Sequence, residues 1–202
     1  MKIIGLCGGS GSGKGKVCEV FRENNIPTID TDALYREMTS QKSPCLDALK
    51  AEFGKEIITD NGDLNRDKLA EIVFSGKDMD IKRAKLNEIS HRFILDETRC
   101  RIKQFEKDGF SLVVVDAPLL FESGFDSECD FVVCVIADRN VRIQRIMSRD
   151  NITLEQAKRR IAAQLSDGET VSRSDFVIRN NSDIEELRGE VKSVITKILK
   201  LN

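Results

Sequence analysis

A glycine-rich segment near the amino terminus carries the residues with the most specific spacing in the chain. Residues 8–14 read Gly-Gly-Ser-Gly-Ser-Gly-Lys, which matches the pattern G-x-x-x-x-G-K. Glycines let the main chain fold around a phosphate with its amides pointing inward, and Lys14 can reach the β and γ oxygens. An apolar run precedes the segment and apolar residues at helical spacing follow it, as a phosphate-binding loop requires. We therefore expect a nucleoside triphosphate to bind here.

One position of this segment departs from the pattern. The residue after the lysine is normally Ser or Thr, whose hydroxyl binds Mg²⁺, but this chain has Gly15. We expect Mg²⁺ to be held through water and nucleotide oxygens, because it needs few protein ligands. Lys16 opposes the dipole of the following helix by about 0.3–1 kcal/mol, a sign that bound phosphate would reverse, so we predict that Lys16 binds the triphosphate. The expected phosphate-binding residues are Gly9, Gly11, Ser12, Gly13, Lys14, Gly15 and Lys16.

Acidic residues follow two other apolar runs. Asp30 and Asp32 come after the run at 27–29, and Asp116 comes after the run at 112–115. Ligands of open α/β sheets bind at the carboxyl ends of strands, so one carboxylate of the first pair could orient an acceptor hydroxyl for phosphoryl transfer. The alternative is that this pair forms a turn or a helix cap. Asp116 is the candidate carboxylate for supporting Mg²⁺.

Arginines recur every three or four residues between 139 and 149 and therefore share one face of a helix. Guanidinium groups suit the spread charge of a phosphoryl-transfer transition state, because each offers several donors in a fixed fork. A solvated helix face is an equally good interpretation for any single arginine. If the segment closes as a lid, only some of these side chains can reach phosphate. The four residues are Arg139, Arg142, Arg145 and Arg149.

The elements that must position these residues follow from hydrophobic patterning. Continuous apolar runs indicate strands covered on both faces, and their alternation with helical patterns predicts an α/β fold with a parallel, doubly covered sheet. Residues 46–107 are helical in pattern and highly charged, which indicates a helical insertion. Helix starts are expected at two capping-box sequences, 153–156 and 182–185. The expected strands lie at 2–7, 27–29, 112–115, 131–137 and 176–178.

Composition narrows the class of protein. The chain has 202 residues, of which 40% are hydrophobic and 33% charged, so it suits a globular fold with a full core. Lys+Arg 32 against Asp+Glu 34 gives a net charge of −2, so no overall positive field favours nucleic acid or a membrane as partner. The six cysteines contain no C-x-x-C pair and fit reduced core thiols. We expect a cytoplasmic monomer.

Further motifs extend over nearly the whole chain and keep a recognisable order. The motifs are Ile29-Asp-Thr-Asp32, Phe53-Gly54, Asp63-Leu-Asn-Arg66, Leu69-Ala70, Val73-Phe74, Leu86-Asn87 with His91, Pro118-Leu-Leu-Phe-Glu122, Arg145 with Arg149-Asp150, Gln164, and Asp175-Phe-Val-Ile178 with Asn180. Together with the glycine-rich loop they resemble the dephospho-coenzyme A kinase family, which performs the last step of coenzyme A synthesis.

The resemblance implies a fold and a division of the chain. The fold is a P-loop NTPase of three layers, α/β/α, with a parallel five-stranded sheet, a helical substrate-binding insertion and a helical lid. The nucleotide-binding core would span 1–32 and 109–202, the helical coenzyme A-binding domain 33–108, and the lid 139–165.

The resemblance also implies roles for single residues. Lys14 would hold the transferred phosphoryl group, Asp32 would act as base or orienting group for the ribose 3′-hydroxyl of dephospho-coenzyme A, and Arg142 would be catalytic. ATP would also contact Arg145 and Asn180, the latter beside adenine. The implied cosubstrates are ATP, with Mg²⁺, and dephospho-coenzyme A. The residues implied near dephospho-coenzyme A are Asp32, Arg66, His91, Leu119 and Glu122.

The sequence departs from the family pattern at three places. Gly15-Lys16 replaces the usual Ser-Thr, Arg92 stands where proline is common, and Thr170 stands where the lid often carries lysine. Two alternatives follow from the first departure. Gly-Lys-Gly resembles the adenylate kinase loop and suggests a nucleoside monophosphate kinase, although a phosphate acceptor would favour arginine in place of Asp32. The missing hydroxyl instead suggests a nucleotide-binding regulatory module without catalysis.

Overall fold

The centre of the molecule is a five-stranded sheet with the strand order β2-β3-β1-β4-β5. The computed structural model describes residues 1–201. Strand β1 pairs in parallel with β3 and with β4, and β4 pairs in parallel with β5. This architecture confirms the predicted parallel α/β sheet. The strands are β1 (Lys2–Cys7), β2 (Thr28–Asp30), β3 (Leu112–Asp116), β4 (Phe131–Ile136) and β5 (Phe176–Arg179).

The continuous apolar runs form strands because both faces of the sheet are covered. All five residues of β3 are buried, and β4 is buried at its four central positions. A solvated face would instead require polar residues at every second position. The carboxyl ends of β1 and β3 are adjacent, since Leu6 pairs with Asp116. The loop that follows β1 therefore starts beside the carboxylate that ends β3.

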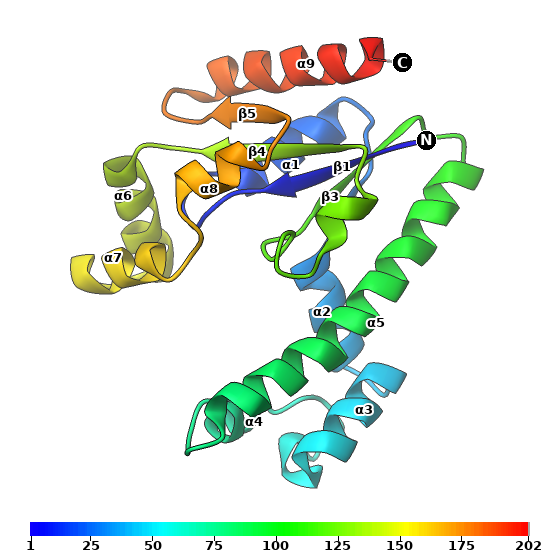
Figure 1. Cartoon of the computed structure of the whole chain (residues 1–202), viewed down its shortest axis with the longest axis vertical. Helices are drawn as coiled ribbons and strands as arrows, with labels where there is room; N and C mark the ends of the chain where they lie inside the picture. The colour runs from blue at the N-terminus through cyan, green and yellow to red at the C-terminus, as the bar shows by residue number, and fades with distance from the viewer. Residues whose placement is uncertain (202) are drawn as a thin grey trace. The chain divides into compact units, whose positions relative to one another are not determined.

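One face of the sheet is covered by α1 (Lys14–Glu23) and α9 (Ile184–Lys200). Figure 1 shows α9 running alongside β5. The apolar stripe predicted for α9 is buried from Leu187 to Ile198, but Ile184 at its start is 41% exposed. The N-cap of α9 is Asp183, whose carboxylate accepts from the Glu185 and Glu186 amides at 3.0 Å. The predicted capping box at 182–185 therefore placed the helix start one residue too early.

Helices also extend past the carboxyl ends of the central strands. The chain leaves β4 into α6 (Arg139–Asp150) and α7 (Leu154–Ala162), then enters α8 (Asp167–Ser172), which contacts β4 (Figure 1). The capping box predicted at Thr153 and Gln156 is confirmed at the start of α7. Ile146 of α6 and Ala157 of α7 are fully buried against each other's helices. These helices surround the functional residues described below.

The chain divides into two compact units, and the second is helical. The first unit comprises Met1–Ile29 and Gln104–Asn202, and the second comprises Asp30–Lys103. The second unit has its own core, which includes Leu49, Ile57 and Val73, with Leu86 and Phe93 packed against it. The elements of the second unit are α2 (Thr31–Thr39), α3 (Pro44–Phe53), 3-10 turn η1 (Lys55–Ile57), α4 (Arg66–Val73) and most of α5 (Met79–Lys107).

None of the helices within residues 1–201 combines the length and apolar composition of a membrane-spanning segment.

Candidate active site

The glycine-rich segment forms a tight loop between β1 and α1. Its backbone has positive φ at Gly11 (78°) and Gly13 (90°), a conformation that side chains with a Cβ disfavour. Close contacts add a second reason for glycine. A Cβ on Gly9 would lie 2.2 Å from Nη2 of Arg142, and one on Gly11 would lie 2.6 Å from the Arg142 carbonyl oxygen. The loop therefore folds beneath α6 in a shape that other residues could not adopt.

Lys14 and Asp116 form an ion pair at the edge of the loop. Their side chains are only 14% and 12% exposed, and the second carboxylate oxygen of Asp116 accepts a hydrogen bond from the Cys18 thiol at 3.3 Å. The sequence predicted a role for each residue separately, and the adjacency of β1 and β3 brings them together. The lysine, which is the first residue of α1, is thus held at the loop, where it can meet a phosphate.

The residues around this ion pair fit a magnesium ion that has few protein ligands. Asp116 supplies carboxylate oxygen, the ligand type that Mg²⁺ prefers, while Gly15 supplies no side-chain oxygen. Within residues 1–201, no group of three or more His, Cys, Asp or Glu side chains is arranged to hold a metal. A hydrated Mg²⁺ that also binds phosphate oxygens suits this set better than a fully protein-coordinated ion.

Arg142 is the buried member of the arginine face. Its side chain is 4% exposed, and Nη1 lies 2.6 Å from Asp167 at the start of α8. The Nε group donates to the Ser10 carbonyl at 2.9 Å, and Nη2 lies 3.4 Å from Oε1 of Gln164. Gln164 in turn accepts from the Ser10 amide at 2.9 Å. Arg142 therefore does not belong to a solvated helix face. Its side chain connects the loop to the helical segment that follows β4.

Arg145 and Asn180 fasten the opposite side of the loop. Asn180 is buried, and its amide nitrogen donates to the Ser12 carbonyl at 2.8 Å. Arg145 donates to the Asn180 carbonyl at 3.1 Å and lies 3.4 Å from the Ser12 carbonyl. The Ser12 hydroxyl itself is buried with no hydrogen-bond partner among the described residues, so the contacts of Ser12 run through its main chain. Both predicted nucleotide residues therefore lie directly at the loop.

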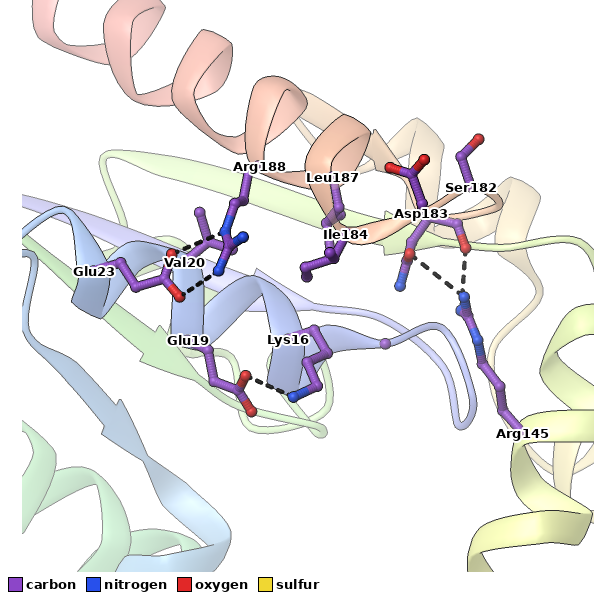
Figure 2. A pocket seen from close by; sticks show the side chains of 12 residues that line it. Lys16, Glu19, Val20, Glu23, Arg145, Ser182, Asp183, Ile184, Leu187 and Arg188 are labelled. Carbon is purple, nitrogen blue, oxygen red and sulfur yellow. Dashed lines mark hydrogen bonds and ion pairs between the residues drawn. The ribbon is translucent and has the colours of Figure 1, made fainter.

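A cavity of about 490 Å³ opens beside the first turn of α1. This volume lies within the range of about 300–1,000 Å³ typical of small-molecule sites. Val20 of α1 and Leu187 of α9 provide apolar lining, and Figure 2 shows Lys16 on one side of the cavity and Arg145 at one end. The exposure of Ile184 is explained here, because this side chain also lines the cavity.

An ion pair closes the other end of this cavity. Arg188 contacts Glu23 at 3.1 Å, as the dashed lines in Figure 2 show. The hydrogen bond from Arg188 lowers the pKa of the Glu23 carboxyl below its usual range. The pair connects α1 to α9 and sets the length of the cavity.

A smaller cavity of about 100 Å³ lies on the other side of the loop. It is lined by Gly9 of the loop and by Leu119 and Glu122 of the segment predicted to contact the acceptor. Arg173 holds this segment, since its guanidinium lies 3.9 Å from the centre of the Phe121 ring and 3.3 Å from the Asp126 carboxylate. The loop is thus bordered by two separate cavities.

The cysteines near the loop are free thiols with unequal acidity. A hydrogen bond with Cys134, its partner in the β1–β4 register, lowers the pKa of Cys7. Burial, together with Asp126, Glu128 and Asp130, raises the pKa of Cys129 to about 12. Cys7 and Cys134 are buried, as the predicted core role requires, whereas Cys129 is half-buried and the prediction was wrong for Cys100, which is exposed on α5.

The remaining predicted residues lie in the helical unit. Asp30 caps α2, because its carboxylate accepts from the Ala33 amide at 2.9 Å. Asp32 lies in the first turn of α2 and is exposed. Arg66 donates to the Thr39 hydroxyl at 2.9 Å and lies over the Tyr35 ring at 5.6 Å. His91 is half-buried on α5.

Sequence reasoning missed two residues of the site, Asp167 and Arg173. A local signal existed for the first, because Ser166 and Glu169 form a capping box that starts α8. That signal indicates a helix but says nothing of the ion pair with Arg142. For Arg173 no local signal existed, since its partners Phe121 and Asp126 lie far away in the sequence.

Comparison with known proteins identifies the family to which this chain belongs. The sequence profile described as Dephospho-CoA kinase matches residues 2–186. A dephospho-CoA kinase of Listeria monocytogenes is 38% identical over 199 residues, covering 98% of each chain, and one of Bacillus cereus is 36% identical over 195 residues, covering 96% of each. The chain belongs to the dephospho-CoA kinase family. Among solved structures, TT1252 from Thermus thermophilus superposes with a TM-score of 0.80 at 28% identity, covering 98% of this chain and 97% of the other.

Membership of the dephospho-CoA kinase family identifies the reaction and its cosubstrates. The protein is an ATP-dependent phosphotransferase that acts on dephospho-CoA in the last step of CoA synthesis. The resemblance drawn from the sequence motifs and the P-loop NTPase fold are both confirmed. The nucleoside monophosphate kinase and the regulatory module are not favoured by this membership.

Proposed function

We propose that ATP lies in the 490 Å³ cavity, with its phosphates on the loop and its adenine between α1 and α9. The cavity begins at Gly13 and Lys16, where main-chain amides and a cation meet the helix amino terminus, an arrangement that attracts phosphate. It continues between Val20 and Leu187, whose apolar surfaces suit a planar base. Arg145, at one end of the cavity, and Asn180, with which it bonds, provide hydrogen-bond donors and acceptors.

Dephospho-CoA is proposed to bind the helical unit, residues 30–103, and the segment 119–122. Arg66 supports this assignment, because its guanidinium is oriented by Thr39 and Tyr35 and retains donors for a phosphate group. His91 and Glu122 are proposed as further polar contacts, and Leu119 as an apolar one. Leu119 is 47% exposed, which leaves its side chain available to a ligand.

The proposed reaction is a direct transfer between ATP and the ribose hydroxyl. Asp32 accepts a hydrogen bond from the 3′-hydroxyl and takes its proton as the oxygen bonds to the γ-phosphorus. The bond from that phosphorus to the β,γ-bridging oxygen breaks, so ADP and CoA are formed. Lys14 and Arg142 are proposed to stabilise the charge on the phosphoryl oxygens, which is the main source of catalysis in such reactions.

Mg²⁺ is proposed to bind at Asp116 through few protein contacts. When bound, it would neutralise charge on the β- and γ-phosphate oxygens. The segment 139–165 is proposed to act as a lid, supported by the contacts of Arg142 and Gln164 with the loop. A monomer in the cytoplasm is proposed as well. The free thiols fit a reducing compartment.

The observation that carries this assignment is the convergence of Lys14, Asp116 and Arg142 on a single glycine loop beside a cavity of nucleotide size. The test separates the two acidic residues after β2. Asp32→Asn should lower kcat by about 10²–10⁴-fold while the melting temperature stays unchanged, because a proton acceptor is lost from an exposed position.

Asp30→Asn is the matched control for this experiment. Asparagine caps helices about as well as aspartate, so this variant should keep both the fold and the activity. The measurement is steady-state production of CoA from ATP and dephospho-CoA, followed by chromatography. Equal loss of kcat in the two variants, or full activity of Asp32→Asn, would show that Asp32 is not the acceptor's base.

A further inference from the structure

The first turn of α1 has an unusual arrangement of charge. It begins Lys14-Gly15-Lys16, and its N-cap Gly13 makes no side-chain capping bond. Lysines at a helix amino terminus oppose the helix dipole. Lys14 is compensated by its ion pair with Asp116, whereas Lys16 has only an exposed pair with Glu19, so the charge of Lys16 becomes favourable when a polyanion binds there.

Gly15 is not required by space or by backbone conformation. A Cβ built on Gly15 meets no heavy atom of residues 1–201 within 4 Å, and its φ is not positive. The neighbouring Gly13 differs, because its φ is 90° and a Cβ would lie 1.9 Å from Asn180. A serine at position 15 would therefore fit, so the lack of the magnesium-binding hydroxyl is a property of this sequence and is not forced by the fold.

Lys16 lies at the cavity where the nucleotide phosphates are proposed to bind. It shares the lining with Gly13, Arg145 and Asn180, and Figure 2 shows it on α1 with its ammonium beside Glu19. Its ammonium lies 2.7 Å from Glu19, but the two side chains are 60% and 51% exposed. Such an exposed pair contributes little and can be exchanged for a stronger, charge-assisted bond to phosphate.

We propose that Lys16 replaces the missing hydroxyl by binding the nucleotide phosphates directly, so that ATP binding by this protein does not require a metal ion. The proposal rests on the assignment of ATP to this cavity and adds a statement about which form of the nucleotide binds. Metal-free ATP carries two more negative charges than MgATP, and Lys16 and Arg145 line the cavity while Lys14 lies at the same loop in its ion pair with Asp116. A loop that depends on a hydroxyl-bound Mg²⁺ would instead bind metal-free ATP poorly.

The test is calorimetric titration of the full-length protein with ATP in EDTA and with MgATP. For the unmodified protein we expect the two dissociation constants to agree within about tenfold. Lys16→Thr should weaken binding of metal-free ATP by about tenfold, the value of one charge-assisted hydrogen bond, and should weaken MgATP binding less. Gly15→Ser should tighten MgATP binding and leave metal-free ATP binding unchanged.

Two further variants separate direct contact from a general effect of charge. Lys85→Thr is the matched control, because Lys85 also lies 2.8 Å from a glutamate three residues on, in the helical unit. It should leave both affinities unchanged. Glu19→Gln should tighten metal-free ATP binding about threefold by releasing Lys16, and this gain should disappear in the Lys16→Thr background.

The outcomes distinguish this inference from the assignment on which it rests. If the protein binds neither form of ATP, the nucleotide site itself is wrong. If MgATP binds and metal-free ATP binds more than about a hundredfold more weakly, the inference is overturned while the site stands. An equal gain from Glu19→Gln in both backgrounds would also overturn it, because the effect would then be long-range.

Discussion

At the scale of single residues, members of one helix face meet very different surroundings. Arg142 and Arg149 belong to the same arginine series on α6, but their side chains are 4% and 62% exposed. Arg149 pairs with Asp150 at the surface, whereas Arg142 is bound by acceptors from the loop and from α8. Helical spacing alone does not distinguish Arg142 from Arg149, but the exposed fractions of their side chains do.

Arg142→Lys should therefore be a severe change. Lysine has one ammonium and cannot reproduce a guanidinium that donates in several directions at once. We expect a loss of about 1–3 kcal/mol in the free energy of unfolding, because the buried acceptors lose a charged donor, and a fall in kcat if Arg142 also meets the phosphoryl group. Thermal denaturation and steady-state kinetics measure the two effects.

Arg149→Lys serves as the control at the same helix face. Its exposed ion pair contributes roughly 0–1 kcal/mol, so this variant should melt within a few degrees of the unmodified protein. Equal melting temperatures for Arg142→Lys and the unmodified protein would contradict the structural role assigned to Arg142.

At the scale of elements, the loop after β1 and the start of α1 contain glycines of two kinds. Gly13 has a φ of 90° and lies against Asn180, while Gly15 lies in open space on α1. Gly13→Ala should cost at least about 1–2 kcal/mol in the free energy of unfolding, because alanine is unfavourable in the left-handed region. Gly15→Ala should leave the melting temperature unchanged or raise it slightly, since alanine favours a helix. Differential scanning calorimetry of the two variants tests this difference, and similar melting temperatures would contradict it.

The elements also show what the sequence could and could not predict. Local patterns identified the five strands, the start of α7 and the buried stripe of α9, because hydrophobic periodicity and capping depend on neighbouring residues. The short helix α8 was missed although its capping box is present, and the start of α9 was misplaced. The helix is capped by Asp183, the residue after the predicted cap Ser182, and local sequence does not rank two adjacent residues whose side chains can both cap.

The candidate site, like the elements, was predictable only where local sequence patterns mark it. The glycine loop, Lys14 and Asp116 follow from motifs at strand ends, and their pairing follows from the strand order. The ion pair between Arg142 and Asp167 and the contact of Arg173 with Phe121 join segments that no local pattern connects. Such contacts depend on how loops fold over the sheet, so they emerge only from the tertiary structure.

At the scale of the whole molecule, the chain consists of two compact units with separate cores. The proposed assignment places ATP on the unit formed by residues 1–29 and 104–202, and most contacts to dephospho-CoA on residues 30–103. A ligand that binds only the folded state stabilises the part of the structure it contacts, by about 2.7 kcal/mol at a hundred times its dissociation constant. Each substrate should therefore protect mainly its own unit.

Amide hydrogen exchange measured with one substrate at a time tests this expectation. ATP should slow exchange most in the loop, in α1 and in the first turns of α9, whereas dephospho-CoA should slow exchange most in α2, α4 and the middle of α5. Lys14→Met supplies the control, because it should abolish the protection by ATP and leave that by dephospho-CoA intact. If ATP protected the helical unit as strongly as the loop, or if dephospho-CoA protected only the sheet unit, the proposed division of the two substrates between the units would be wrong.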